Sequence, residues 1–206
     1  MTLNVAARGS RTRPSLAWIL QVVIPTAVLV SGATAQQPAP PANKEISGFL
    51  RIHWGASAQD VINAFGSPMV DKSNEGGNRV LVYKDRVVNR PALALFYLDQ
   101  QKGLMKGIYS VTYGPGNDCE ALFHNLTTLV ERTFGGGLRP LELRTQSDEK
   151  VAFCDAAARG KASWSVTWTE AGSGNSVRVN LEPEGKLVDL IFQSGSFRLE
   201  TGKKQS

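Results

Sequence analysis

The sequence predicts an α+β protein made of two tandem modules, each a helix packed on an antiparallel sheet of three or more strands. Helical apolar spacing occurs twice, and each time segments rich in β-branched and aromatic residues follow between turn signals. The strands of the two halves also keep a constant separation. Phe96 and Val179, like Leu104 and Leu187, differ by 83 in residue number, which is typical of an internal duplication.

Residues 1–35 have the pattern of an export signal. Arg8, Arg11 and Arg13 precede an apolar run at 16–30, and small residues at 33–35 suit cleavage. The run is shorter than the roughly 20 residues that span a bilayer. We therefore predict cleavage, no stable membrane anchor afterwards, and a periplasmic or secreted protein of the bacterial envelope. The alternative is an anchor that is never removed.

The rest of the chain divides by composition into a tether, two modules and a tail. The formal net charge of +5 includes three signal arginines, so the mature chain carries about +2, which gives no basis for nucleic-acid binding. The predicted boundaries are a proline-rich tether at 36–45, a first module at 46–115, a second module at 116–200 and a disordered tail at 201–206.

The first module is predicted to begin with a short helix. Ser57 and Asp60 have the spacing of a capping box, and the Gly-Ser-Pro run at 66–68 ends the helix. Three strands are expected after it, at 80–85, 92–99 and 104–113.

The second module repeats this order with a longer helix. Asn117 and Glu120 form a second capping box, and the helix ends at Gly135. An insertion that contains Cys154 is expected before the strands. These strands are predicted at 163–168, 177–182 and 187–193.

Cys119 and Cys154 are the two cysteines of the chain. In an oxidising compartment an even count predicts a disulfide, so we expect these two residues to be bonded. The alternative is a reactive thiolate at Cys119, since a helix N-terminus lowers the pKa of a thiol.

The run from Trp54 to Val61, followed by Phe65-Gly66-Ser67-Pro68 and Leu81-Val82-Tyr83, resembles the helix-plus-three-strand module of bacterial outer-membrane assembly lipoproteins, the SmpA/OmlA or BamE-like family. It is also similar to the tandem modules of the β-lactamase-inhibitor protein fold. The chain differs from the lipoproteins because it has two modules and no lipid-accepting cysteine. The resemblance implies a non-enzymatic protein.

Motifs for catalysis, metal binding and cofactor binding are missing from the sequence. His53 and His124 are the two histidines, and no metal-ligand spacing pairs them. The glycines at 135–137 follow a helix, whereas a phosphate cradle precedes one. We therefore predict no catalytic residue, no metal ligand and no cofactor, and a protein that is not an enzyme.

Strand parity predicts a contact surface. If Trp164, Val166 and Trp168 face the helices, a second set of residues falls on the opposite face of the sheet and forms an apolar patch of the kind that binds partners. These partner-contact candidates are Leu95, Tyr97, Ile108, Leu187 and Ile191. Alternatively, the two modules bury these residues against each other, or one continuous sheet curls over them.

The function that the sequence favours is an exported, non-enzymatic protein-binding or envelope-assembly factor with a protein partner in the cell envelope. Two alternatives stay open. A secreted inhibitor of a hydrolase would lower the activity of its target on mixing, and an undetected envelope enzyme would turn over a wall or glycan substrate.

Overall fold

The chain divides into two units, Met1–Pro38 and Ala39–Ser206. The computed structural model describes residues 44–75, 77–134, 138–146, 150–182 and 186–197, all of them in the second unit. The predicted export signal, residues 36–43 of the predicted tether and the predicted tail at 201–206 lie outside the described residues. Among the described residues no helix is long and apolar enough to cross a membrane.

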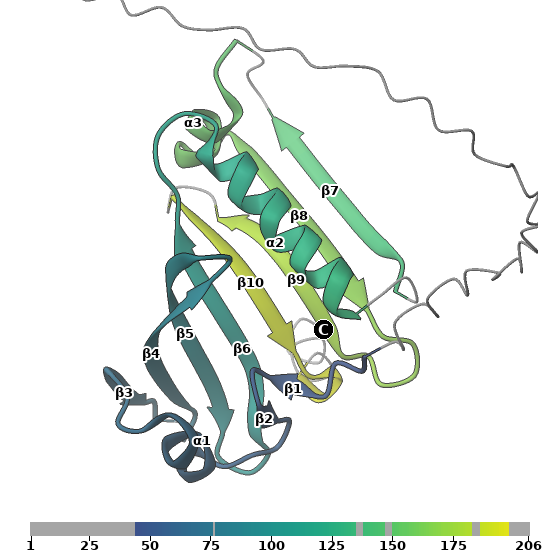
Figure 1. Ribbon diagram of the computed structural model, residues 1–206. Coiled ribbons are helices and arrows are strands. Elements are labelled where there is room, and N and C mark those ends of the chain that lie inside the picture. The colour runs from purple at the N-terminus through teal and green to yellow at the C-terminus, as the bar shows by residue number, and fades with distance from the viewer. Residues whose placement is uncertain (1–43, 76, 135–137, 147–149, 183–185, 198–206) are drawn as a thin grey trace, which may run out of the picture. The chain divides into compact units, whose positions relative to one another are not determined.

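The described residues form one large antiparallel sheet, one small hairpin and helices (Figure 1). The small hairpin joins β1 (Gly48–Phe49) to β2 (Ile52–His53). The helices are α1 (Ala58–Phe65), α2 (Asp118–Phe134) and α3 (Phe153–Ala158). The strands of the large sheet are β3 (Val70–Ser73), β4 (Arg79–Val87), β5 (Arg90–Asp99), β6 (Gly103–Thr112), β7 (Pro140–Gln146), β8 (Ala162–Thr169), β9 (Ser176–Glu182) and β10 (Leu187–Gln193). Their order across the sheet is β3-β4-β5-β6-β10-β9-β8-β7.

The prediction of two separate helix-on-sheet modules is wrong. β6 pairs with β10 from Thr112 opposite Leu187 to Lys106 opposite Gln193, so the strands of both halves form one continuous eight-stranded sheet within the described residues. Each half alone would leave this strand edge with unpaired backbone N–H and C=O groups, and joining the edges satisfies both sets. The sequence pattern identifies the strands but not which edges meet.

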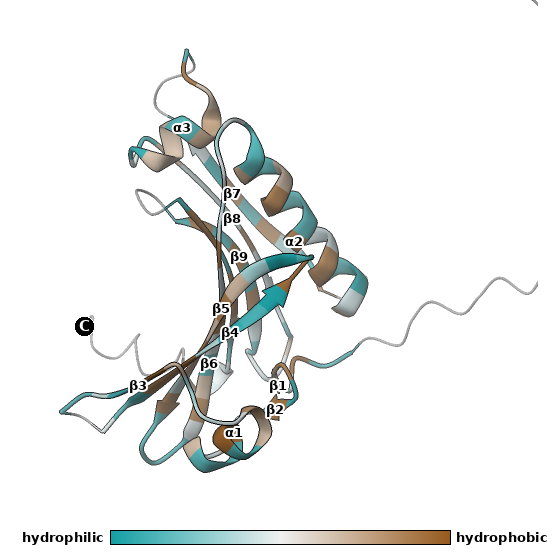
Figure 2. Cartoon of the chain, turned by 60° about the vertical axis from the view of Figure 1, so that its left-hand side comes forward, coloured by the Kyte–Doolittle hydropathy of each residue, from teal (hydrophilic) through white to brown (hydrophobic). Residues whose placement is uncertain are grey.

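The described helices pack on one face of the sheet. Figure 2 shows α1 and α2 on the same side of the strands. α2 contacts β9 and β10, and α3 contacts α2 and β8. On β8 the residues Trp164, Val166 and Trp168 are buried on this side, as parity predicts. A single apolar core cluster runs through both halves of the chain, which explains why the halves do not form independent domains.

The predicted capping box of α1 is present. The Asp60 N–H donates to Ser57 Oγ at 3.2 Å, and the Ser57 N–H donates to Asp60 Oδ2 at 2.8 Å. These bonds satisfy backbone donors that a helix N-terminus leaves unpaired. They fix the residue at which α1 begins.

Candidate functional site on the open face of the sheet

The face of the large sheet opposite α1 and α2 is called the open face here. Strand pairing brings apolar residues of neighbouring strands together on it. Leu95 lies opposite Ile108, and Ile108 lies opposite Ile191 on the other side. The row continues from Leu95 through Val82 to Val70. These five residues, named the apolar row, cross five strands, with side chains of neighbours about 5 Å apart.

Three of the predicted contact residues therefore lie side by side. Leu95 and Ile191 are half-buried, and Ile108 between them is 7 % exposed. Val82, Met105 and Ile108 are buried without belonging to the core cluster on the helix side. The open face thus has an apolar centre of its own, separate from the main core.

Tyr97 lies in the neighbouring row, opposite Lys106. The Lys106 ammonium is 5.3 Å from the centroid of the Tyr97 ring, a cation–π contact. Burial raises the pKa of the Tyr97 phenol and lowers the pKa of the Lys106 ammonium. Both groups are therefore partly desolvated.

A small cavity of about 120 Å³ adjoins Tyr97. Its lining includes the apolar residues Val80, Leu98, Met105 and Phe197 and the charged residues Arg79 and Asp99. A cavity of roughly 150 Å³ accepts a benzene molecule, so this hollow has about the size of one small apolar side chain.

Leu187 lies apart from the other predicted contact residues. It is opposite Thr112 on one side and Glu182 on the other, four residues along β10 from Ile191. At about 3.4 Å per residue this separates the two side chains by roughly 14 Å. Asp189 stands between them on the same face, so the predicted patch is interrupted by a carboxylate.

Asp189 is a functional candidate that the sequence analysis missed. It lies opposite Ser110 and Asn180, and its Oδ1 is buried without a hydrogen-bond partner among the described residues. Burial raises the pKa of Asp189 to about 6, and the nearby Glu182 adds to the rise, whereas Ser110 and Lys106 oppose it. The sequence did contain a signal for it: Leu187, Asp189 and Ile191 alternate along one strand, which places the acid on the same face as the two apolar residues.

We expect Asp189→Asn to change how stability depends on pH. The pKa of the folded carboxyl exceeds the ordinary 3.8, so the folded chain binds this proton more tightly than the unfolded chain. The resulting stability is present below pH 3.8 and lost as pH rises through about 6. The variant should therefore be more stable than wild type by about 1 kcal/mol at neutral pH, because wild type carries a desolvated negative charge there and the neutral amide does not.

Urea unfolding at two pH values, one near neutral and one near 4, measures this effect. The difference between variant and wild type should shrink at the lower pH. Glu75→Gln, in an exposed turn, is the control. A difference of equal size at both pH values would show that Asp189 does not titrate in this range.

The open face carries more cations than acids. Among the described strand residues on it, the carboxylates are Glu182 and Asp189, together with the turn-capping Asp99. The cations, which share parity with the apolar row, are Lys72, Lys84, Arg86, Lys106 and Arg178. A partner with apolar side chains flanked by carboxylates would complement this surface.

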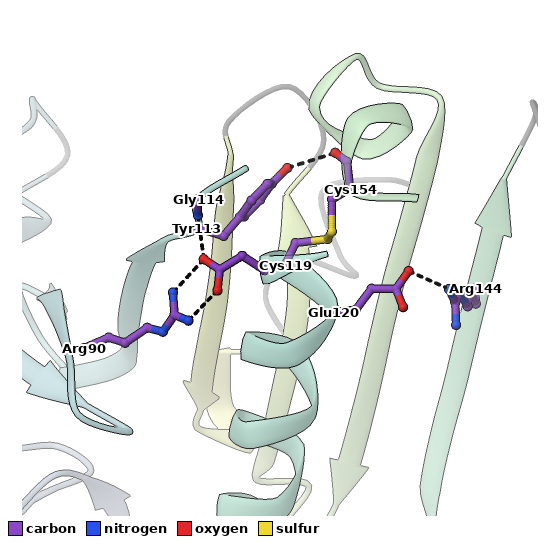
Figure 3. The surroundings of a disulfide bond; sticks show 8 residues. Arg90, Tyr113, Gly114, Cys119, Glu120, Arg144 and Cys154 are labelled. Carbon is purple, nitrogen blue, oxygen red and sulfur yellow. Dashed lines mark hydrogen bonds and ion pairs between the residues drawn. A yellow bond between two sulfur atoms is a disulfide. The ribbon is translucent and has the colours of Figure 1, made fainter. Parts of the chain in front are cut away.

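The disulfide between Cys119 and Cys154 is confirmed, with the two Cα atoms 5.7 Å apart (Figure 3). It joins the first turn of α2 to α3, so Cys119 is not a free thiolate. Next to it the Asp118 carboxylate pairs with both terminal nitrogens of Arg90 and accepts the Gly114 N–H at 2.6 Å. The Arg90 guanidinium holds the pKa of Asp118 at about 2. This end of α2 is a structural anchor.

A larger cavity of about 440 Å³ lies on the helix side, between the β1–β2 hairpin, α2 and the sheet. Phe49, Phe134 and Phe192 line it, and His53 is at its edge. His124 packs edge-on against Trp164, with the ring centroids 5.1 Å apart. The two histidines therefore lie in different parts of the structure. In the part of the chain that the structure describes, no group of three His, Cys, Asp or Glu side chains is placed to hold a metal ion.

Comparison of the chain with protein-family models, with curated proteins and with solved structures finds no match. We therefore infer the function from the geometry of the described residues.

Proposed function

We propose that this protein is an exported, non-enzymatic binding factor of the bacterial cell envelope, and that its open face holds a protein partner. The observation that carries the proposal is the apolar row, in which the half-buried Val70, Leu95 and Ile191 alternate with the buried Val82 and Ile108. It lies on the face opposite α1 and α2, and it adjoins Tyr97 and the small cavity. Contact surfaces combine an apolar centre with a polar rim in this way.

Three features of the open face support a protein as the ligand. The cavity beside Tyr97 has the size for one apolar side chain. The buried Oδ1 of Asp189 needs a hydrogen-bond donor, which a partner backbone or side chain would supply. The strands hold these groups in fixed positions, so little conformational entropy is lost on binding.

The envelope location remains part of the proposal. It is supported by the arginine-rich, apolar pattern of residues 1–35 and by a disulfide of the kind that persists in oxidising compartments. The resemblance of residues 54–83 to the BamE-like module agrees with a role in envelope assembly.

Tyr97→Ala should weaken partner binding by at least about 30-fold, because a central aromatic side chain contributes about 2 kcal/mol or more at an interface. The partner is first isolated by cross-linking the tagged protein in its native cells. Its affinity for purified wild-type and variant chains is then measured by calorimetry. Leu129→Ala, an exposed position on α2 at the other face, is the matched control and should bind normally.

Circular dichroism must show that the Tyr97 variant keeps its fold. If the folded variant binds the isolated partner as tightly as wild type while Leu129→Ala weakens binding, the contact surface lies on the helix side and the proposal is wrong.

A further inference from the structure

The two edge strands of the large sheet differ in how they are protected. β3 has four residues, and three of them are Asp71, Lys72 and Ser73. Short, polar edge strands are a common protection against unwanted pairing. β7 has seven residues and contains no lysine, and its described pairing is with β8 alone. Among the described strands none pairs with the outer edge of β7 along Leu141–Thr145, so this stretch is a candidate for pairing with another strand.

β7 also exposes the two most exposed large apolar side chains of the described residues. Leu141 is 63 % exposed and Leu143 is 60 % exposed, and both lie on the open face. The alternate residues Glu142 and Arg144 lie on the helix side, where Glu142 accepts a hydrogen bond from Trp164 Nε1 at 2.7 Å. The Arg144 guanidinium stacks over the Trp164 ring at 4.3 Å. An edge with exposed leucines and fixed charges is suited to pair with a specific strand.

We propose that β7 is a self-association edge, at which two copies of this chain pair their β7 strands antiparallel with Leu143 opposite Leu143 of the partner subunit. This inference is independent of the proposed function, because it concerns the edge of the sheet and not the apolar row.

The charges on β7 select this register. With Leu143 at the two-fold axis, Glu142 of each copy lies opposite Arg144 of the partner subunit, which places opposite charges together twice. A register centred on Glu142 would set two carboxylates against each other, and one centred on Arg144 would set two guanidinium groups against each other. Opposite charges across strands stabilise a pair and like charges destabilise it. A register shifted by one residue would place the helix side of one copy and the open face of the other on the same side of the joined sheet.

The same register serves the leucines. Leu141 lies opposite Thr145 of the partner subunit, and the two Leu143 side chains meet at the axis, all on the open face. The interface is self-complementary, as a two-fold dimer requires. Because it is one strand wide, its buried area is below that of a standard stable interface, and we expect a dimer that dissociates at low concentration.

Engineered cysteines test the register directly. Opposite residues of an antiparallel pair have Cα atoms about 4.5–5.5 Å apart, within the range of a disulfide. Leu143→Cys should therefore form a covalent dimer in a glutathione redox buffer. Leu141→Cys is the matched control on the same strand and face, because the two copies of residue 141 would lie roughly 14 Å apart. A mixture of Leu141→Cys and Thr145→Cys chains should form the mixed dimer.

Sedimentation equilibrium supplies the second measurement. The chain without its predicted export signal, residues 36–206, is examined from about 1 to about 300 µM. We expect a monomer–dimer equilibrium that Leu143→Lys weakens at least tenfold, since it places two ammonium groups together at the axis. Met69→Lys, also at an exposed apolar position, should leave it unchanged.

The proposal is overturned by a monomer at every concentration. It is also overturned if Leu141→Cys cross-links as fast as Leu143→Cys, or if a strand of another protein, and not a second copy, occupies β7 in the cross-linked product.

Discussion

Phe49→Ala is expected to lower the free energy of unfolding by about 3–5 kcal/mol. Phe49 is 0 % exposed, and its ring centroid lies 5.0 Å from that of Phe96 and 5.2 Å from that of Tyr109. The ring rests on Gly107, where a Cβ atom would come within 2.0 Å of it. No side chain of β6 fills this position, so truncating Phe49 leaves a cavity between the β1–β2 hairpin and the sheet.

Leu50→Ala is the matched control for this prediction. Leu50 is the next residue in the chain but is 43 % exposed, so its truncation should change stability by no more than about 0.5 kcal/mol. Urea unfolding followed by tryptophan fluorescence measures both variants. Equal midpoints for the two variants would contradict the packing of Phe49 on the sheet.

Replacing both Cys119 and Cys154 by alanine should cost about 3–4 kcal/mol and lower the melting temperature by roughly 10 °C. The disulfide joins residues 35 apart in the sequence, and opening this loop increases the freedom of the unfolded chain. It also ties α3 to α2 beside Tyr113, whose hydroxyl donates to the Cys154 carbonyl oxygen at 3.5 Å.

Calorimetric melting with and without dithiothreitol checks this prediction. The reductant should destabilise wild type by a similar amount and leave the double alanine variant unaffected. If wild type melts at the same temperature in both conditions and thiol assay shows that the bond is reduced, the disulfide contributes no stability.

The sequence predicts most of the local structure, because alternation and capping are local properties. The strands expected at 80–85, 92–99 and 163–168 lie within β4, β5 and β8. β3 was missed because three of its four residues are polar. β7 was missed because nearly all of its residues are exposed, so its pattern resembles that of an exposed loop.

The pairing of β6 with β10 could not be predicted, and this is the reason for the wrong architecture. Hairpins are specified by turns between neighbouring strands, whereas this pair joins residues 103–112 to residues 187–193. Either strand would satisfy its backbone groups with any free edge. The choice depends on how Phe49, Phe192 and the rest of the shared core pack, which no single segment encodes.

The proposed contact surface was partly predictable, because the alternation of side chains along a strand is a local property. Parity alone places Leu95, Ile108 and Ile191 on one face, and the cross-strand register then brings them together. Asp189 was missed because a single acid within a strand usually faces water. Ser110 and Asn180, which lie opposite it on the two adjacent strands, become its neighbours only in the folded sheet.

Site-specific photo-cross-linking in the native cells tests the central claim most directly. A photoreactive amino acid is placed at Tyr97 or Ile191 on the open face, and at Leu129 or His124 on the helix side. We expect one and the same envelope protein to be cross-linked from both open-face positions and from neither helix-side position. Cross-linking of that protein from Leu129 and His124, with none from Tyr97 and Ile191, would contradict the proposal.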